Sequence, residues 1–368
     1  MLHSPFAPSL NSISKLNFKA QVHEPVSKLK FMRQLRKISE KPKQTPEFSH
    51  YLRAITMTNL QNSTDRATQF YDWQGYRCSY DQWGTAQPNQ PVLLLIHPIG
   101  VGLSRHFWTR FINAWERSGS ALAIFNPDLL GCGDAAKPRY ALYPEDWADQ
   151  LLHFVQTVVQ RPVILVVQGA LFPVAIEMVE RSTNANGAID IRGLILSGPP
   201  AWQVMAEVAP KWQQKLLWNG LFDSWIGAAF FQYAKRRQFL SSFSAKQLFA
   251  ALPDIDEEWL SMLDQGAADP ASRHAVFAFL ARFWQKGYAE KIRKIPYPTL
   301  ALFGETASSI SKSGKQESPD QRLNLYLENL PQGEGYKLPG RNVLPYESTT
   351  AFTHAVSEFT LKLLVKID

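Results

Sequence analysis

The sequence predicts an α/β fold in which a mostly parallel central sheet is flanked by helices and carries an inserted helical cap. Two observations support this prediction. From Gln69 onward, short apolar runs alternate with helical segments, which is typical of a parallel sheet covered on both faces. Residues 201–296 break this alternation, have no apolar strand run and hold 17 aromatic residues. Because this stretch lies between two expected strands, we expect a cap inserted into the sheet and not a second domain that follows it.

The expected elements follow one another in a simple order. Residues 70–84 predict a hairpin that turns at Gln74 and Gly75, and residues 92–100 form an apolar run typical of a strand buried on both faces. The later strand segments are ALAIFNP, VILVVQG, IRGLILS, YPTLALFG and GYKLPG. Helices are expected over 144–159, directly after VILVVQG, and over 348–366.

Charge separates an N-terminal extension from the folded body. Residues 1–56 hold ten Lys/Arg and three Glu, whereas the other 312 residues hold 29 basic and 29 acidic residues. A nucleic-acid-binding domain needs a basic face, so the neutral body argues against that function. The extension is expected to be a disordered tail, an organelle transit peptide or a mis-called start before Met57. We favour the disordered tail or the mis-called start. The rest of the chain is expected to divide into a first part of the core (57–200), the cap (201–296) and a second part of the core (297–368).

The two cysteines and the hydropathy of the chain indicate the cellular compartment of the protein. Cys78 and Cys132 give neither a disulfide framework nor a metal-ligand spacing, which favours a reducing compartment. No run of 18 apolar residues is present, so no transmembrane helix is expected. We expect a cytoplasmic protein without a cofactor or a metal, or an imported one if residues 1–56 are a transit peptide.

Five segments between Gln69 and Leu364 resemble motifs of the α/β-hydrolase superfamily, in particular its capped branch of esterases, epoxide hydrolases and haloalkane dehalogenases. LLLIHPIG resembles the strand and HGxG-type oxyanion loop, and NPDLLGCGD resembles the DxPGxGxS loop. PVILVVQGALFP stands at the nucleophile elbow, PTLALFGETA at the strand that delivers the acid, and GYKLPGRNVLPYES at the segment that delivers the histidine. The resemblance implies an α/β-hydrolase fold.

The resemblance places no nucleophile at the elbow. Aligning VILVVQGALFP on G-x-S-x-G puts Gly169 at the nucleophile position, with Val167 and Leu171 at the flanking small positions. Glycine has no side chain that could attack a substrate, although it enters strained backbone conformations at little cost. Gly169 therefore keeps the elbow shape, or the turn has relaxed, and the sequence leaves both open.

The acid and histidine positions have also changed. Ala307 stands where the family has a carboxylate, and Glu305 lies two residues too early. Arg341 or Asn342 stands at the histidine position, with Glu347 at the usual distance after it. Arginine stays protonated and asparagine does not titrate, so neither is a general base. We therefore expect a degenerate catalytic triad and no conventional serine-hydrolase activity.

Two further features lie near the ancestral site. The expected oxyanion-like loop consists of His97, Pro98, Ile99, Gly100 and Ala170. Its backbone N–H groups would bind a carbonyl or an anion, unless the loop is only the turn that the fold requires. Cys132 is expected to be a buried structural residue or, if Arg341 lies nearby, a reactive thiol.

The aromatic cap suggests a pocket. At helical spacing most of its rings are expected to pack between cap and sheet, but the same rings would line an apolar pocket outside the strand ends. The pocket and cap candidates are Cys132, Trp202, Trp218, Phe222, Trp225, Phe283, Trp284 and Arg341. Lys235, Arg236 and Arg237 follow several of these aromatics in the sequence. They are expected to form a solvated helix end or to contact an anionic membrane surface.

Three hypotheses on function follow. The leading one is a non-catalytic hydrolase-fold protein, a pseudoenzyme, that binds a hydrophobic small molecule or a protein partner in the cap cleft. The second is an active hydrolase or lyase that uses Cys132 or a water held by Glu305. The third is a structural subunit of a larger assembly.

Overall fold

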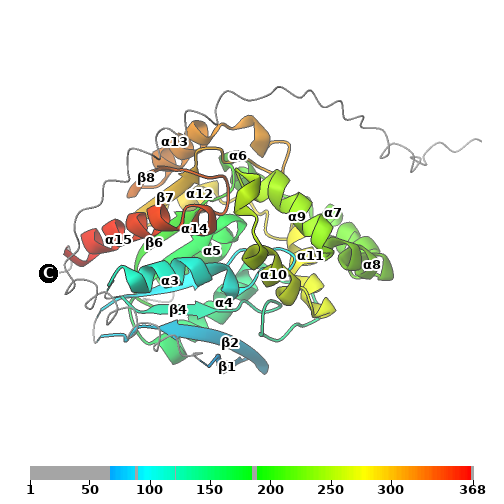
Figure 1. Ribbon diagram of the computed structural model, residues 1–368, viewed down its shortest axis with the longest axis horizontal. Helices are drawn as coiled ribbons and strands as arrows, with labels where there is room; N and C mark the ends of the chain where they lie inside the picture. The colour runs from blue at the N-terminus through cyan, green and yellow to red at the C-terminus, as the bar shows by residue number, and fades with distance from the viewer. Residues whose placement is uncertain (1–66, 88–89, 121, 185–188, 366–368) are drawn as a thin grey trace, which may run out of the picture. The chain divides into compact units, whose positions relative to one another are not determined.

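An eight-stranded sheet forms the centre of the computed structural model, which describes residues 67–87, 90–120, 122–184 and 189–365 (Figure 1). The strand order is β1-β2-β4-β3-β5-β6-β7-β8. The strands are β1 (Gln69–Trp73), β2 (Tyr76–Trp83), β3 (Val92–Ile96), β4 (Ile124–Pro127), β5 (Val163–Gln168), β6 (Ile191–Ser197), β7 (Thr299–Gly304) and β8 (Gly333–Leu338). The β1–β2 and β2–β4 pairs are antiparallel and all other pairs are parallel, which confirms the predicted fold class.

Helices cover the sheet and form the cap. The helices next to the sheet are α3 (Thr109–Arg117), α4 (Pro144–Phe154), α5 (Phe172–Asn184), α13 (Pro319–Asn329), α14 (Leu344–Glu347) and α15 (Thr349–Val365). Between β6 and β7 the chain forms α6 (Trp202–Ala206), α7 (Lys211–Leu217), α8 (Trp225–Ala234), α9 (Arg237–Phe243), α10 (Glu257–Gly266), α11 (Arg273–Leu280) and α12 (Ala289–Ile292). Of these, α7, α8 and α9 lie to the right of the sheet in Figure 1, and α8 lies farthest out. The expected N-terminal extension, residues 1–56, lies outside the described residues.

The predicted hairpin is present with its predicted turn. Trp73 pairs with Tyr76, so only two residues connect β1 to β2. Both of them, Gln74 (φ 51°) and Gly75 (φ 79°), have positive φ angles. A two-residue loop with two positive φ angles matches the right-handed twist of the flanking strands.

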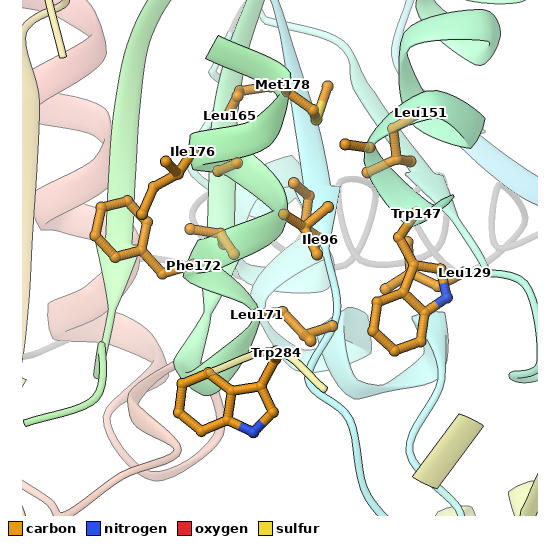
Figure 2. Close-up of a cluster of buried hydrophobic side chains, with 14 of the residues drawn as sticks. Ile96, Leu129, Trp147, Leu151, Leu165, Leu171, Phe172, Ile176, Met178 and Trp284 are labelled. Atoms are coloured by element: carbon orange, nitrogen blue, oxygen red, sulfur yellow. The ribbon is translucent and has the colours of Figure 1, made fainter. Parts of the chain in front are cut away.

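The strands bury apolar side chains on both faces of the sheet. Along β5, Val163, Leu165 and Val167 point into the core beneath α4 and α5 (Figure 2). The alternate residues Ile164 and Val166 point into a second core formed with α3 and α15. This alternation explains why β5 reads as a continuous apolar run, since successive side chains of a strand leave on opposite faces.

The parallel arrangement brings six connecting segments to one edge of the sheet. β3 to β8 run in the same direction, so the segments after each of them leave at the same edge. These are the segments in which the resemblance placed the oxyanion loop, the elbow, the acid and the histidine. Within the described residues, no helix combines the length and the apolar character needed to traverse a bilayer.

Candidate functional site

The elbow at Gly169 keeps a sharp turn between strand and helix. β5 ends at Gln168, a short 3-10 turn spans Gly169–Leu171, and α5 begins at Phe172. Gly169 has φ +61°, a left-handed conformation that glycine adopts without steric cost. Of the two alternatives left by the sequence, the structure has the tight turn.

The space in front of Gly169 is open. A Cβ atom built on Gly169 would meet only the carbonyl oxygen of Gly198, at 4.0 Å. Gly169, Ala170 and Gly198 are half-buried, and so are Ile99 and Gly100 of the oxyanion-like loop. The flanking Val167 and Leu171 are buried members of the core cluster beneath α5, and Figure 2 shows the side chain of Leu171 there.

Ala307, which the sequence comparison with the family placed at the acid position, carries a buried methyl group. Ala307 is 7% exposed, and its backbone N–H donates to the carbonyl oxygen of Gly304 at 3.0 Å. Glu305, two residues earlier, is exposed. Its backbone N–H donates to Leu338 of β8, so the backbone there still belongs to the sheet edge.

Asn342, one of the two residues expected at the histidine position, cross-links three segments. Its side-chain Nδ2 donates to the carbonyl oxygens of Gln247 at 2.6 Å and Ser308 at 3.0 Å. Its Oδ1 accepts the backbone N–H of Ser308 at 3.3 Å, and its own carbonyl accepts Nε2 of Gln168 at 2.7 Å. The side chain of Asn342 therefore joins the cap to the loop after β7, while its backbone contacts the residue before Gly169.

Arg341 and Glu347 fasten the same loop to the cap. The Arg341 guanidinium donates to the carbonyl oxygen of Lys246 at 3.1 Å, within a helical turn that spans Ser244–Leu248. The Glu347 carboxylate accepts the backbone N–H groups of Arg341 at 2.8 Å and Ala250 at 2.6 Å. Both side chains are thus engaged with backbone groups of the loop and the cap.

His97 is a structural residue of the oxyanion-like loop. It is completely buried, its Nδ1 lies 2.8 Å from the carbonyl oxygen of Pro98, and its Nε2 accepts the backbone N–H of Leu129 at 3.0 Å. These partners fix the neutral ring with its proton on Nδ1. Burial lowers the pKa of the imidazole, which favours the same neutral form. His97 thereby ties the loop after β3 to the loop after β4.

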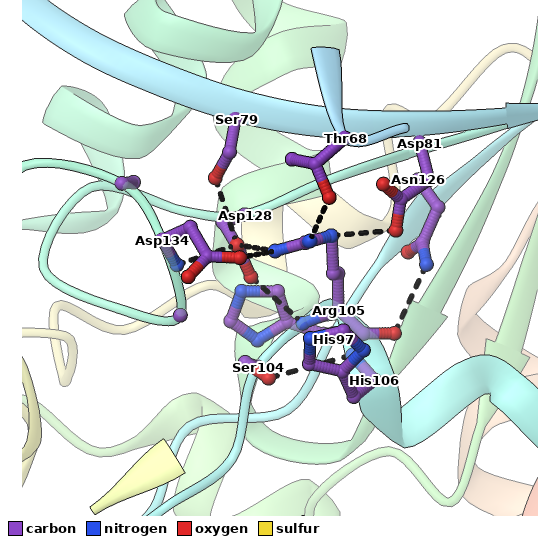
Figure 3. Close-up of polar contacts among 12 residues, drawn as sticks. Thr68, Ser79, Asp81, His97, Ser104, Arg105, His106, Asn126, Asp128 and Asp134 are labelled. Atoms are coloured by element: carbon purple, nitrogen blue, oxygen red, sulfur yellow. Dashed lines mark hydrogen bonds and ion pairs between the residues drawn. The ribbon is translucent and has the colours of Figure 1, made fainter. Parts of the chain in front are cut away.

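A buried ion pair that the sequence analysis missed supports both of these loops (Figure 3). Arg105 is 2% exposed and forms an ion pair with the completely buried Asp128. The Arg105 guanidinium also contacts Asp81 at 2.6 Å and Asp134 at 2.8 Å. Asp128 in turn accepts from Ser79 at 2.8 Å and from the Asp134 backbone N–H at 2.9 Å. Arginine looks like any surface cation in sequence, so only the burial reveals this role.

The neighbours of Asp128 in this cluster determine the pKa of its carboxyl group. Burial alone would raise the pKa of its carboxyl group, but Arg105, His97 and two backbone N–H groups outweigh burial and lower it. The charges of Arg105 and Asp128 are therefore both retained in the interior.

Cys132 fits its structural reading. It is 3% exposed, and burial raises the pKa of its thiol well above the usual value. A thiolate is the nucleophilic form of cysteine, and this environment disfavours it. Arg341, the suggested cation, is directed at the carbonyls of Ala245 and Lys246.

The aromatic candidates do not gather around one point. Trp218 and Phe283 pack against each other with ring centroids 5.9 Å apart, and Phe222 stacks on Phe277 at 4.8 Å, so these rings belong to the cap's own core. Trp202 contacts Tyr326 of α13. Trp284 lies below the start of α5, close to Leu171 (Figure 2).

Trp225 requires a correction. Its side chain is 79% exposed on α8, so it does not line a pocket. The reason is that the inner face of α8 is already filled by Phe231, which is completely buried against the ring of Phe277. Among the side chains that the structure describes, no group of three or more His, Cys, Asp or Glu is arranged to hold a metal ion.

Several solved structures share this architecture. An esterase from Thermogutta terrifontis is 17% identical, with a TM-score of 0.60 over 82% of this chain and 99% of its own. An enol-lactonase from Burkholderia xenovorans is 13% identical, with a TM-score of 0.58 over 79% and 99%. A meta-cleavage product hydrolase from Pseudomonas fluorescens is 15% identical, with a TM-score of 0.60 over 80% and 97%. At these identities the likeness concerns the fold alone.

Sequence comparison gives the family directly. A search of curated proteins finds no match. Residues 93–351 match the profile described as the alpha/beta hydrolase family, and this range includes the elbow, the cap and the segments after β7 and β8. The chain therefore belongs to the alpha/beta hydrolase family.

Proposed function

We propose that this family member is catalytically inactive at the family's position and acts by binding a hydrophobic small molecule between the cap and the strand ends. The observation that carries the proposal is the set of residues at the three catalytic positions. Gly169 offers no nucleophile, Ala307 no carboxylate, and the amide of Asn342 is engaged in hydrogen bonds to backbone groups.

Loss of these groups removes most of the chemistry that the fold performs elsewhere. A serine hydrolase needs a base to take the proton of its nucleophile and an acid to orient that base. An amide does not titrate, so Asn342 cannot replace the imidazole. Backbone donors remain, because the N–H of Ala170 stands in the first turn of a helical segment, where it has no intrahelical acceptor.

Half-buried backbone groups and two buried polar side chains at this edge of the sheet favour a bound ligand. Ile99, Gly100, Gly169 and Ala170, in the segments after the neighbouring strands β3 and β5, are all half-buried, and the space in front of Gly169 is open up to the carbonyl oxygen of Gly198. Below it, the side chains of Gln168 and Ser197 are register partners on β5 and β6. In the described part of the chain, both Oε1 of Gln168 and Oγ of Ser197 are buried without a hydrogen-bond partner. A ligand or a water with a donor group would relieve that cost.

The alternative function, an active hydrolase with unconventional residues, has less support. Cys132 is buried and its thiol pKa is raised, and Glu305 is exposed on the sheet edge. Burial disfavours the thiolate that a nucleophilic Cys132 would need, and exposure leaves Glu305 in contact with solvent.

Ester hydrolysis tests the catalytic half of the proposal. The full chain is incubated with the p-nitrophenyl esters of acetate, butyrate and decanoate, and we expect release of nitrophenol at the rate of buffer alone. Turnover that disappears in Cys132→Ala or Glu305→Gln would establish the alternative instead.

Ligand capture tests the binding half. We expect native mass spectrometry of the purified chain to reveal a bound apolar molecule, or titration with methyl decanoate to show saturable binding. Ile99→Trp places a large ring beside the open space and is expected to abolish either signal, whereas Leu361→Trp on α15 leaves it intact. A chain that is empty and does not bind methyl decanoate would contradict the binding proposal.

A further inference from the structure

Helix α8 is apolar on the side that faces away from the protein. Its sequence, WIGAAFFQYA, contains no charged residue. Gly227, Phe231 and Ala234 are buried against the rest of the cap. Trp225, Ile226, Phe230 and Tyr233 are 79%, 43%, 41% and 51% exposed. At about 100° per residue these four side chains share a sector of roughly 140°, opposite the buried side. A helix that is apolar all round is typical of a buried or membrane-associated segment.

Helix α7, which the turn at Trp218–Phe222 connects to α8, also carries exposed apolar side chains. Trp212 and Leu216 lie one helical turn apart and are 66% and 63% exposed. Ten of the fifteen large apolar side chains that are exposed among the described residues lie between Val208 and Leu280. Such concentration marks an interaction surface, since isolated exposed apolar residues are scattered over ordinary surfaces. We call Trp212, Leu216, Trp225, Ile226, Phe230 and Tyr233 the α7–α8 face.

Basic residues are close in sequence to the α7–α8 face, and Arg236 lies over the ring of Tyr233, 5.6 Å from its centroid. Residues 208–246 contain six Lys/Arg and one acidic residue, Asp223, which is paired with Arg139 at 2.8 Å. Arg237 is paired with Glu257 and Asp264. In the part of the chain that the structure describes, no carboxylate lies within ion-pair distance of the remaining cations that flank the face in sequence, which are Lys211, Lys215, Lys235 and Arg236.

We propose that the α7–α8 face docks on the surface of an anionic lipid bilayer. Trp and Tyr rings prefer the depth of the lipid headgroups, and basic side chains beside them meet the phosphates and anionic headgroups. α8 has ten residues and a length of about 15 Å, so it lies in the interface and does not cross it.

The charge argues against the other occupants of this face. A second copy of the chain would form a twofold contact in which the same patch meets itself, so one basic patch, with Lys211, Lys215, Lys235 and Arg236, would meet another basic patch. A partner protein would need acidic groups around an apolar centre. An anionic bilayer provides both features at once, and it matches the concentration of aromatic side chains.

Vesicle co-sedimentation of the full chain tests the proposal. Vesicles of phosphatidylcholine alone are compared with vesicles that contain phosphatidylserine, at low and high salt. We expect binding to the anionic vesicles that weakens with salt, and little binding to the neutral ones. No binding to anionic vesicles, or equal binding to both kinds, would overturn the proposal.

Variants of the cap assign the binding to this face, because the basic residues 1–56 remain the same in all of them. Replacing Lys211, Lys215, Lys235 and Arg236 together by glutamine is expected to weaken binding at least about a hundredfold, since each cation near the surface contributes about fivefold. Trp225→Asp is expected to weaken it about tenfold or more. Leu361→Asp, which changes an exposed leucine of α15, is the matched control and is expected to bind like the unchanged chain.

Two results would overturn the assignment. If both cap variants bind like the unchanged chain, another segment holds the membrane. If the chain is a dimer without vesicles and Trp225→Asp makes it monomeric, the face is an interface between copies. All substituted side chains are exposed or half-buried, so circular dichroism is expected to show unchanged folding.

Discussion

Asn342 shows how a residue at a catalytic position can serve the architecture instead. Its amide both donates and accepts, so it satisfies the backbone N–H and carbonyl of Ser308 and also the carbonyl of Gln247. An imidazole has two ring nitrogens and cannot make all three contacts. This set of contacts explains why an asparagine suits this place in the fold.

The Arg105–Asp128 pair is expected to be a main determinant of stability. Arg105→Met leaves a buried carboxylate without its cation and should lower the free energy of unfolding by about 3–5 kcal/mol. Arg237→Met removes a cation from an exposed pair with Glu257 and should change little. Urea unfolding of both variants compares them, and equal effects would contradict the role given to Arg105.

A serine at the elbow should not restore activity. Gly169→Ser supplies a hydroxyl but no base, so we expect ester hydrolysis to stay at the level of the unchanged chain. The left-handed conformation at φ +61° should cost about 1–2 kcal/mol of stability. Gly119→Ser is the matched control, because Gly119 has φ +71° and a Cβ there meets no atom within 4 Å. Hydrolysis by Gly169→Ser but not by Gly119→Ser would contradict this prediction, because it would require a general base beside residue 169.

At the scale of elements, the sequence predicted the strands better than the helices. Runs such as VILVVQ are apolar on both sheet faces, which is typical of a central strand that is covered by helices on both sides. α3 and α13 were missed, although both carry readable signals. In α13, Ser318 and Gln321 form a capping box with Pro319 at the first turn. In α3, Phe111, Ile112 and Trp115 have the spacing of one helix face.

The loop after β8 and the cap are expected to loosen together. Glu347→Ala removes the acceptor of the backbone N–H groups of Arg341 and Ala250, which should cost about 1–3 kcal/mol. Limited proteolysis should then cut the chain between 244 and 256 faster than before. Glu328→Ala on α13 is the control, because that side chain is exposed. If Glu328→Ala accelerates the cleavage equally, the hydrogen bonds of Glu347 do not hold the loop and the cap together.

For the whole molecule, the order of motifs along the chain predicted which loops meet, because parallel strands deliver their ends to one edge. What those side chains do at that edge was not predictable. Whether Trp225 faces a pocket or solvent depends on which side of α8 Phe231 fills, and helical spacing allows either. Asn342 looked like a mere substitution in the sequence, and its contacts with Gln247 and Ser308 depend on how the cap folds back.

Acid should destabilise the whole fold through its internal carboxylates. The pKa of Asp128 is lowered from the usual 3.8, so the unfolded chain takes up its proton first. The stabilisation is complete above pH 3.8 and is lost as pH falls through the lower native pKa. Urea unfolding between pH 7 and pH 3 should show this fall, and Asp128→Asn should flatten it. A curve that is equally steep in the variant would assign the effect to other carboxylates, such as Asp256, whose pKa is also lowered.

The bare turn at Gly169 has a practical consequence. Fluorophosphonate reagents tag serine hydrolases by forming a bond to the oxygen of the nucleophilic serine, and this position presents no atom that they can modify. From the proposed function we therefore expect labelling surveys of a proteome that use such reagents to pass over this chain, even in a cell where it is abundant.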